Sequence, residues 1–291
     1  MIQTTTEITE QGYYEECAPV QHSTTRYAVS KCIFSENTDY AHTVIIDNPD
    51  YGRMLFLDKE LQSCSYDEKI YHETLVHPAL NSLKGDENNI LVIGGAEGAT
   101  VREVLKWKRK IKNIDWVDID KKLVNVCKEH LQYAEPKIYS TNESVKFYAQ
   151  DIMVFLENCT GTKYNCIIID LPDPDPLVNN SLYGSLFWTL IKNVSSSDGI
   201  IVTHTGPVEP GYGRQPGLDF IIKGAFDVGF ENGKAYHTYI PSFQSEWGFW
   251  IYGSSIREFS TKMISKFNVM DSEYQKTIFH WDRHWQLSTG Q

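Results

Sequence analysis

The ten residues Leu91–Thr100, with the sequence LVIGGAEGAT, decide the fold class of this chain. An apolar run that ends in two glycines and continues with helical spacing is typical of a buried strand turning sharply into a helix. Backbone N–H groups at the start of such a helix form a binding turn for nucleotides. Tight strand-to-helix turns also use glycine for structural reasons alone, so the turn needs supporting features before it indicates a ligand.

The segments around this turn predict an α/β fold. From residue 68 the spacing of apolar residues is helical, and after it short apolar runs alternate with helical segments. The expected strands are Ile90–Ile93, Ile114–Asp118, Val145–Ala149, Cys166–Asp170, Ile200–His204 and Trp247–Tyr252, and the expected helices are Thr100–Trp107, Lys121–His130 and Ser185–Lys192. Such alternation predicts a parallel sheet with helices on both faces.

The chain before this region predicts a small antiparallel β domain. Arg26–Phe34, His42–Asp47 and Arg53–Leu57 are short and rich in β-branched or aromatic residues, and the turn sequence DNPDYG separates the last two. We therefore expect an N-terminal β domain over residues 1–75 and a catalytic domain over residues 76–291. The aromatic segment Thr277–Gln286 has no assigned place in this scheme.

Composition limits the class of protein. The chain has 291 residues, 41% of them hydrophobic and 22% charged, which is ordinary for a globular protein. A net charge of −11 disfavours nucleic acid and anionic membranes as partners. No apolar run approaches the roughly 18 residues of a membrane span, and the N-terminus does not resemble a signal peptide, so we expect a cytoplasmic protein. The six cysteines lack metal-site spacing, so we expect free thiols.

Acidic residues mark the carboxyl edge of the predicted sheet, where ligands bind in such folds. Asp118 ends the strand about 20 residues after the glycines, the usual place for an acid that binds ribose hydroxyls. Asp151 follows the next strand at the same edge. Glu97 would repel a phosphate in the turn, so NAD and ATP are disfavoured, whereas a nucleoside with a sulfonium and an ammonium is favoured. Glu97 is also compatible with a simple helix first-turn residue.

The sequence Asp170–Pro176, DLPDPDP, follows another buried strand and carries Asp170, Asp173 and Asp175. Three carboxylates at one strand end indicate a cationic ligand, and the prolines stiffen the loop. A di- or polyamine suits these acids. A divalent metal is the rival ligand, although the loop lacks the glycine of an EF-hand turn. A solvated acidic loop without a ligand is the third reading.

These motifs together resemble the polyamine aminopropyltransferases, the family of spermidine, spermine and thermospermine synthases. The resemblance covers residues 25–255 and rests on five motifs in order. They are YG followed by LD at residues 51–58, LQS with DE and IYHE at residues 61–73, GGAEGAT with REVL, VDID at residues 117–120, and DLPDP. Glu97 in the turn, the DLPDP loop and Pro241–Phe243 with Trp247 and Gly248 look most like the thermospermine synthase branch.

The resemblance implies a Rossmann-like sheet of the class I methyltransferase type and a role for each matching residue. Decarboxylated S-adenosylmethionine would be the cosubstrate, with no prosthetic group and no metal. Glu97 would hold its aminopropyl ammonium, Asp118 its ribose and Asp151 its adenine amine. The remaining cosubstrate residues would be Gln62, Gly94, Gly95 and Gly98. Family resemblance also suggests a homodimer or homotetramer, with no nucleic-acid or membrane partner.

On the acceptor side, the resemblance implies that Asp170 receives the proton of the attacking amine, assisted by Tyr71. Asp173 and His72 would orient the polyamine or diamine. Phe243 would line its site, and Glu246 would meet the far amine of a long acceptor. Tyr71 and His72 are alternatively plain packing residues of the helix after the β domain.

The chemistry agrees with these residue types. A thioether leaves readily from a sulfonium, so displacement at the adjacent carbon needs only an uncharged amine held in line. An aliphatic amine has a pKa of about 10.4 and arrives protonated at neutral pH. We expect its proton to leave in stages, through Tyr71 or water to Asp170.

Departures from the family pattern leave other functions open. Ala41 stands where a glutamine is usual, Ser65 and Tyr66 where Glu-Arg is usual, and Ala96 replaces a turn glycine. Residues 206–217 predict a lid or a plain surface loop. Aminopropyl transfer is the favoured hypothesis. Methyl transfer from intact S-adenosylmethionine to an amine, and a non-catalytic polyamine-binding protein, are the alternatives.

Overall fold

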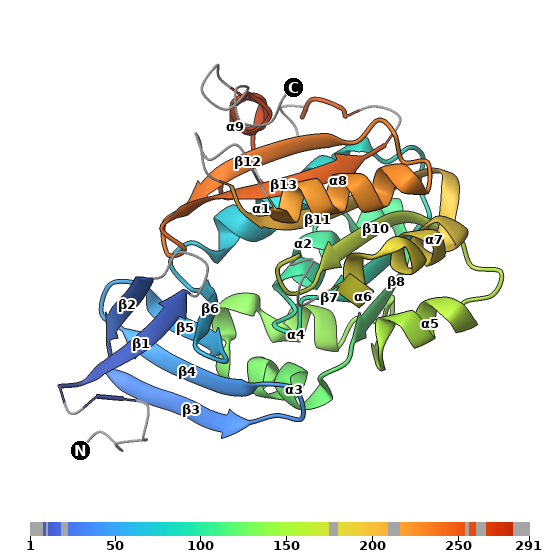
Figure 1. Ribbon diagram of the computed structural model, residues 1–291. Helices are drawn as coiled ribbons and strands as arrows, with labels where there is room; N and C mark the ends of the chain where they lie inside the picture. Colours follow the sequence, from blue (N-terminus) through green and yellow to red (C-terminus); the bar gives the residue numbers. More distant parts are fainter. Residues whose placement is uncertain are drawn as a thin grey trace.

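A small β region packs beside a larger α/β sheet in the computed structural model of the chain (Figure 1). The structure describes residues 8–9, 11–18, 23–174, 180–208, 216–253, 256–259 and 266–281. Asp175 and the middle of the predicted lid, residues 209–215, lie outside the described residues, as do residues 282–286 of the C-terminal aromatic segment. Within the described part, no helix is long and apolar enough to cross a bilayer.

The predicted N-terminal antiparallel β region is confirmed. Its first pair is β1 (Tyr13–Ala18) with β2 (Ser23–Ala28). A four-stranded sheet follows in the order β3 (Lys31–Asn37), β4 (His42–Asn48), β5 (Gly52–Leu57) and β6 (Glu60–Cys64). The predicted strand Arg26–Phe34 is therefore two strands. The second hairpin strand, β6, is short and polar, and the sequence analysis did not predict it.

Alternate residues of this sheet pack in two directions. Val44 and Phe56 join the core of the N-terminal region, together with Tyr14 and Tyr27. Ile45 and Leu55 face the other way and pack against α3 (Lys121–His130) of the larger domain. The β region is thus joined to the larger domain by a shared apolar core.

The first long helix, α1 (Glu68–Ser82), connects the two parts. The predicted domain division after residue 75 falls inside this helix and stays a prediction. Most of α1 is buried, and it packs against α2 (Ala99–Leu105) and against β10 (Tyr164–Asp170), β11 (Ser195–Pro207) and β12 (Lys234–Ile240) of the larger sheet. Its side chains consequently reach several parts of the molecule.

The larger sheet has seven strands in the order β12-β13-β11-β10-β7-β8-β9. The strands β11, β10, β7, β8 and β9 run parallel, whereas β13 is antiparallel to both β11 and β12. Their bounds are β7 Asn88–Gly94, β8 Ile111–Asp118, β9 Val145–Ala149, β10 Tyr164–Asp170, β11 Ser195–Pro207, β12 Lys234–Ile240 and β13 Ser245–Tyr252. The mostly parallel α/β sheet predicted from the sequence is confirmed.

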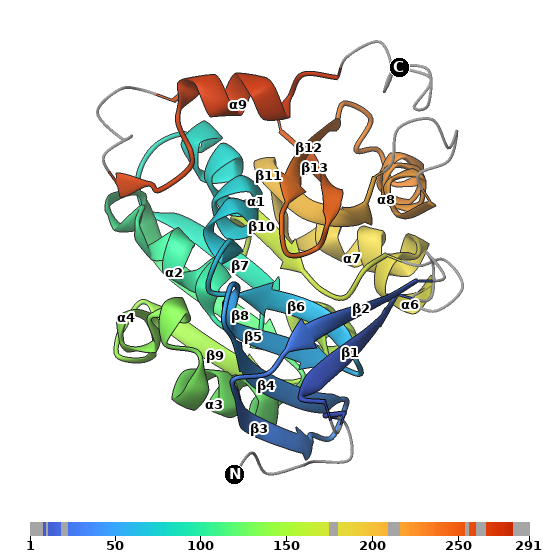
Figure 2. The same cartoon turned by 90° about the vertical axis from the view of Figure 1, so that its left-hand side faces the viewer.

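Helices cover both faces of this sheet (Figure 2). In β7, Ile90 and Val92 face the core that contains α1, α2 (Ala99–Leu105) and α4 (Pro136–Ser140), whereas Leu91 and Ile93 face the opposite core. The helices of the opposite core are α5 Ile152–Asn158, α6 Asn180–Tyr183, α7 Ser185–Val194 and α8 Pro216–Asp227. This arrangement explains why the strands are apolar without alternation.

Three short helical segments complete the fold. Two 3₁₀ turns, η1 (Lys108–Lys110) and η2 (Gln132–Ala134), flank β8 and α3. The helix α9 (Ser272–Ile278) lies near β12 at the top of Figure 1. The carboxylate of Glu73 fixes the chain just before α9, since it accepts from the backbone N–H groups of Asn268, Val269 and Met270 at 2.7–2.9 Å.

Candidate active site

The glycine turn after β7 packs directly against the end of β10. Gly94 pairs with Asp170 in the sheet register, and the N–H of Gly95 donates to the carbonyl oxygen of Asp170 at 2.8 Å. Both glycines have positive φ, and a Cβ on Gly95 would lie 2.7 Å from Oδ2 of Asp170. A Cβ on Gly94 would overlap the carbonyl oxygen of Asp170. The glycines are therefore required for the close approach of the two strand ends.

The far end of the turn is constrained in the same way. Gly98 has a φ of +81° at the N-cap of α2, and a Cβ there would overlap the ring of Tyr139. Ala96, by contrast, lies outside the left-handed region that its glycine neighbours occupy. Its methyl group therefore fits the turn without backbone strain.

Two hydroxyl groups hold the carboxylate of Asp170. The hydroxyl of Tyr71 donates to Oδ1 at 2.7 Å, and that of Thr100 donates to Oδ2 at 2.6 Å. Burial and the charge of Asp170 raise the pKa of Tyr71 well above its usual value, so the phenol stays protonated. Tyr71 and Asp170, predicted as a catalytic pair, are thus in direct contact. Thr100 was not predicted, because a threonine in a helix first turn carries no distinctive signal.

Aromatic side chains surround Tyr71. Its ring lies 6.2 Å from that of Phe243 and 5.9 Å from that of His204, measured between centroids. Phe243 in turn lies 4.6 Å from Trp247. Aromatic rings thus line the strand edge beside Asp170. Such an apolar surface suits the methylene groups of an aliphatic chain.

His72 contacts the carboxylate of Glu97. The distance from Nε2 of His72 to Oε1 of Glu97 is 2.6 Å, and Ser63 donates to the other oxygen of Glu97. Both side chains are almost fully buried. Burial lowers the pKa of His72, but the carboxylates of Glu97 and Glu68 raise it well above the usual value. The structure therefore places His72 beside the predicted cosubstrate turn.

Asp118 ends β8, and Asp151 follows the end of the adjacent strand β9. The N–H of Gln150 donates to the carbonyl of Asp118 at 3.2 Å, and Asp118 itself accepts from the N–H of Asp120 at 2.8 Å. Burial raises the pKa of Asp118 to about 7. Asp151 caps α5 and accepts from the N–H of Met153 at 2.8 Å. Both acids are therefore at the expected edge of the sheet.

The acceptor side contains a residue that the sequence analysis missed. His204, at the end of β11, is only 3% exposed. Its Nδ1 lies 3.6 Å from Oδ1 of Asp173, and its Nε2 lies 2.5 Å from the carbonyl oxygen of Leu171. Its ring is stacked with that of Trp247 at 6.2 Å. The available signal was a polar side chain at the carboxyl end of a predicted strand.

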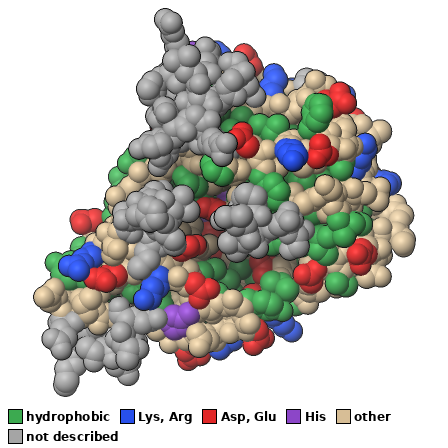
Figure 3. Space-filling model, in the orientation of Figure 1, with side chains coloured by type: hydrophobic (Ala, Val, Ile, Leu, Met, Phe, Trp, Pro, Cys, Tyr) green, Lys and Arg blue, Asp and Glu red, His purple; other side chains and the backbone are tan. Residues whose placement is uncertain are grey.

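The remaining predicted residues have local partners. The amide of Gln62 donates to the carbonyl of Glu60 at 3.2 Å. Oε2 of Glu246 lies 2.9 Å from Nδ1 of His237 on the neighbouring strand β12. Figure 3 shows acidic side chains on the face seen in Figure 1, including the hollow at its centre.

One buried cluster outside this edge has metal-binding residue types. Ligand atoms of Glu73, His77 and Glu103 lie within 4.8 Å of one another in the described part of the chain. The ammonium of Lys106 lies 2.6 Å from Oε2 of Glu103 and 3.3 Å from Oε1 of Glu73. A lysine ammonium therefore already supplies the cation in this cluster.

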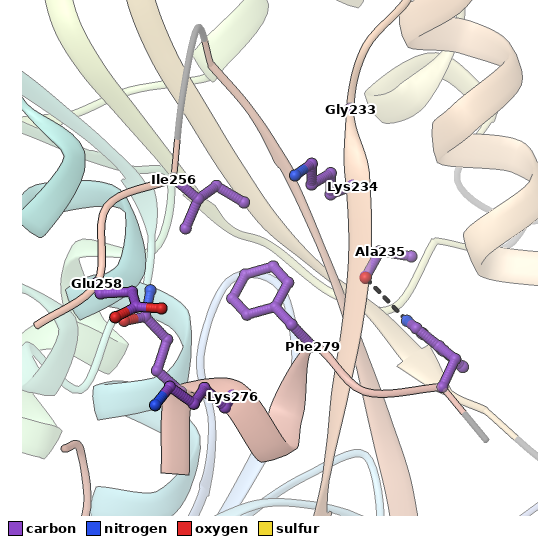
Figure 4. Close-up of a pocket in the computed structure, with 9 residues that line it drawn as sticks. Gly233, Lys234, Ala235, Ile256, Glu258, Lys276 and Phe279 are labelled. Atoms are coloured by element: carbon purple, nitrogen blue, oxygen red, sulfur yellow. Dashed lines mark hydrogen bonds between the residues drawn. The ribbon is translucent and has the colours of Figure 1, made fainter. Parts of the chain in front are cut away.

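A surface cavity of about 380 Å³ lies beyond the site (Figure 4). Lys234, Glu258, Lys276 and Phe279 line it, and the indole of Trp281 donates to the carbonyl of Ala235 at 3.0 Å. It includes none of the predicted site residues.

Comparison with known proteins identifies the family. A model of the spermine/spermidine synthase domain matches residues 68–263, and a model of the spermidine synthase tetramerisation domain matches residues 12–64. The chain belongs to the spermine/spermidine synthase family. This confirms the resemblance that the sequence motifs indicated.

Relatives and solved structures agree with this membership. The chain is 34% identical to the polyamine aminopropyltransferase of Saccharolobus islandicus, over 78% of this chain and 73% of the relative. It is 35% identical to that of Sulfurisphaera tokodaii, over 82% and 77%. A spermidine synthase from Thermotoga maritima has a TM-score of 0.80 at 18% identity, covering 99% of this chain and 97% of the other. A spermidine synthase in complex with the transition-state analogue AdoDATO has a TM-score of 0.82 at 17% identity, with coverages of 99% and 98%.

Proposed function

We propose that this family member transfers the aminopropyl group of decarboxylated S-adenosylmethionine to a polyamine or diamine and releases 5′-methylthioadenosine. The observation that carries the proposal is the carboxylate of Asp170, held by Tyr71 and Thr100 at the carboxyl edge of the sheet. The nitrogen lone pair of the amine forms a bond to the carbon beside the sulfonium. The carbon–sulfur bond breaks, its electron pair stays on sulfur, and the amine proton passes to Asp170 directly or through Tyr71.

The donor half of the proposal rests on the acids around the glycine turn. Gly94, Gly95 and Gly98 would form the turn on which the sulfonium end of the cosubstrate binds, and Glu97 would hold its ammonium. Asp118 and Asp151 would bind ribose and adenine, because they follow neighbouring strands at the same edge of the sheet. Gln62 would complete this half of the site.

The acceptor half rests on acids spaced along an aromatic wall. Asp170 and Asp173 would bind the cationic nitrogens, and Phe243 would pack on the methylene chain. We add His204 to this group, since it faces Asp173. Glu246 would meet the far nitrogen of a long acceptor in exchange for part of its contact with His237. The contact of His72 with Glu97 supports a place on the donor side rather than on the acceptor.

The finer assignments belong to the same proposal. The motifs shared with the thermospermine synthase branch support a long polyamine as acceptor. The match of residues 12–64 to a tetramerisation domain supports a homodimer or homotetramer. The free thiols Cys64, Cys127, Cys159 and Cys166 are compatible with a reducing, cytoplasmic environment.

Methyl transfer from intact S-adenosylmethionine is the second candidate function. The intact donor carries a carboxylate next to its ammonium. Glu97 is 7% exposed and would face that carboxylate at close range, which repels it. The geometry of the turn therefore favours the decarboxylated donor.

Mass spectrometry tests the proposal. The purified protein is incubated with decarboxylated or intact S-adenosylmethionine, each with putrescine, spermidine, spermine or agmatine. An aminopropyl increment with only the decarboxylated donor supports the proposal and names the acceptor. A methyl increment with the intact donor replaces it with methyl transfer. Absence of product from both donors with all four amines contradicts it.

A matched pair of variants locates the reaction. Asp170→Asn should abolish aminopropyl transfer while donor binding is retained. Asp115→Asn is the control, because Asp115 accepts from Tyr164 at 2.7 Å, the same kind of contact, and Tyr164 starts the strand that Asp170 ends. Equal activity of the two variants would remove Asp170 from the reaction.

A further inference from the structure

Four charged side chains, each in contact with the next, form a buried row behind the predicted cosubstrate turn. They begin at Glu97 and continue through His72 and Glu68 of α1 to Arg102 of α2. The side chains of His72, Glu68 and Arg102 are 2%, 0% and 1% exposed. Glu68 and Arg102 are at the end of this row away from Glu97 and are not among the predicted site residues. The proposed mechanism gives neither of them a role.

The contacts of His72 fix its protonation state. Its Nδ1 lies 2.7 Å from the carbonyl oxygen of Glu68 and 3.0 Å from Oε2 of the same residue. Its Nε2 lies 2.6 Å from Oε1 of Glu97. A lone pair on either ring nitrogen would face an oxygen at 2.6–3.0 Å, and despite burial the carboxylates of Glu97 and Glu68 raise the pKa of His72, so both ring nitrogens carry hydrogen. His72 is therefore an imidazolium that links the two carboxylates.

Arg102 fixes the carboxylate of Glu68 from the other side. Its two terminal nitrogens lie 3.0 Å and 2.7 Å from Oε1 and Oε2 of Glu68, a bidentate pair. Arg102 also donates to the carbonyl of Tyr133 at 2.6 Å and to Oε1 of Glu103 at 2.8 Å. Because Arg102 is 1% exposed and donates to Glu68, Glu103 and the carbonyl of Tyr133 together, these contacts hold the guanidinium and Glu68 in one position.

We propose that Glu68 and Arg102 are positioning residues for the donor: they hold His72 as an imidazolium, and His72 fixes the carboxylate of Glu97 for the aminopropyl ammonium. The inference rests on the proposed function. Glu97 and Glu68 carry two negative charges, and His72 and Arg102 carry two positive charges. The turn thus meets the donor with a carboxylate that is held in one position, so its affinity for the ammonium depends on that position as well as on charge.

Loss of the Glu68 charge should change the titration of His72. The charged groups facing His72 are Glu68 on its own helix, Glu97 from the turn and, behind Glu68, Arg102 from α2. From η2, the titratable phenol of Tyr133 also lies near Glu97. Its oxygen is 2.6 Å from the hydroxyl of Ser63, which in turn contacts Glu97. In the Glu68→Gln variant, Arg102 remains and one of the two carboxylates is gone. His72 then loses its second proton at a lower pH than in the wild type. Above that pH, one ring nitrogen without hydrogen faces an oxygen of residue 68 or of Glu97 and no longer holds it.

The test compares donor and product binding by isothermal titration calorimetry in Glu68→Gln, Arg102→Lys and Glu103→Gln. Decarboxylated S-adenosylmethionine carries the ammonium, and 5′-methylthioadenosine lacks it. Glu103→Gln is the matched control, because it removes an equally buried carboxylate from the same guanidinium without touching His72. Steady-state KM values for donor and acceptor are measured on the same proteins from pH 6 to 9.

We expect Glu68→Gln and Arg102→Lys to weaken donor binding on the order of tenfold or more, the effect of one charge-assisted hydrogen bond. Binding of 5′-methylthioadenosine and the acceptor KM should stay within about twofold of the wild type, within measurement scatter for an untouched contact. In Glu68→Gln the donor KM should rise further as the pH rises. Glu103→Gln should bind both ligands like the wild type.

Two outcomes would overturn the inference. One is an equal loss of donor and product binding, which would show a general structural role, and the other is unchanged donor binding. If Glu68→Gln does not fold, Arg102→Lys decides alone, since it keeps the positive charge but loses the bidentate geometry. A wild type that makes no aminopropyl product refutes the proposed function instead, and that result is independent of the variants.

Discussion

The hydroxyl of Tyr71 lies 2.7 Å from Oδ1 of Asp170, and the pair joins a helix that follows the N-terminal β region to the end of a central strand. Gly95 approaches the other carboxylate oxygen so closely that no side chain fits between them. The carboxylate can therefore change neither its rotamer nor its partner without displacing the glycine turn. The glycine turn and Asp170, the proposed proton acceptor, are therefore built as one rigid unit.

Tyr71→Phe should lower kcat by roughly tenfold to a hundredfold, because it removes a group that relays the amine proton and orients Asp170. Donor binding should not change, since Tyr71 lies on the acceptor side of Asp170. Initial rates and donor calorimetry measure both. Tyr164→Phe is the control, because it deletes the same hydrogen bond at the opposite end of β10. Similar kcat losses in both variants would argue for a purely structural role.

Gly98→Ala should destabilise the protein more than Gly161→Ala does. Both glycines have similar positive φ angles, +81° and +84°, but only at Gly98 would a Cβ overlap a ring, that of Tyr139. Placing an alanine in this left-handed backbone conformation costs about 1–2 kcal/mol of folding free energy at either position. The difference between the variants in urea unfolding isolates the clash, and donor affinity should fall only in Gly98→Ala. Equal unfolding free energies would show that Tyr139 moves aside without loss.

Asp118 should make the stability of the ligand-free protein depend on pH. Its pKa is raised by burial from 3.8 to about 7, so the folded state keeps a proton that the unfolded chain has already released between these values. The stabilising contribution is complete below about pH 4 and is lost as the pH rises through about 7.

Asp118→Asn should therefore gain stability over the wild type as the pH rises from about 4 to about 7, on the order of 4 kcal/mol for a shift of about three pKa units. The asparagine still accepts from the N–H of Asp120 through its oxygen. Urea unfolding of both proteins at pH 4, 6 and 8 measures the difference. A constant offset across these pH values would mean that Asp118 ionises normally in the folded protein.

Glu73→Gln should loosen the chain before α9. Its carboxylate is fully buried and accepts from the backbone of Asn268, Val269 and Met270 as well as from the Asn268 amide. A neutral amide accepts fewer and weaker bonds, so we expect a loss of about 2 kcal/mol and faster amide exchange at these residues. Glu273→Gln, which breaks an exposed pair with Lys276, is the control and should have little effect. Slow exchange in both variants would contradict the anchoring role.

Much of the architecture could be predicted from the sequence, because the central strands are continuous apolar runs and the carboxyl ends of parallel strands share one edge. The edge strand β12 was missed, since its alternation of exposed and buried residues at the sheet border is weak. The strand β6 was missed because it is short and polar. Strand pairing supplies what local sequence preference does not.

The positions of the candidate site residues could be predicted where they follow strand ends. They could be predicted less well where the rotation of a helix decides which neighbour a side chain contacts. Asp118, Asp151 and Asp170 follow from strand position alone. The contact of His72 with Glu97 depends on how α1 is rotated against the turn, which spacing within α1 does not specify. His204 and Thr100 gain their importance only from neighbours distant in the sequence.

Three consecutive residues of α1 point to three different parts of the chain: Tyr71 to the end of β10, His72 to the glycine turn and Glu73 to the segment before α9. Successive helical residues are rotated by about 100°, so Tyr71 and Glu73 point about 200° apart, on nearly opposite sides of the helix. Insertion or deletion of one residue within the first turn of α1 would misdirect all three side chains at once. Homologues should therefore vary in loop length on either side of α1 but not in the number of residues between the helix start and Tyr71, and designed chimaeras should join their parent chains before Glu68.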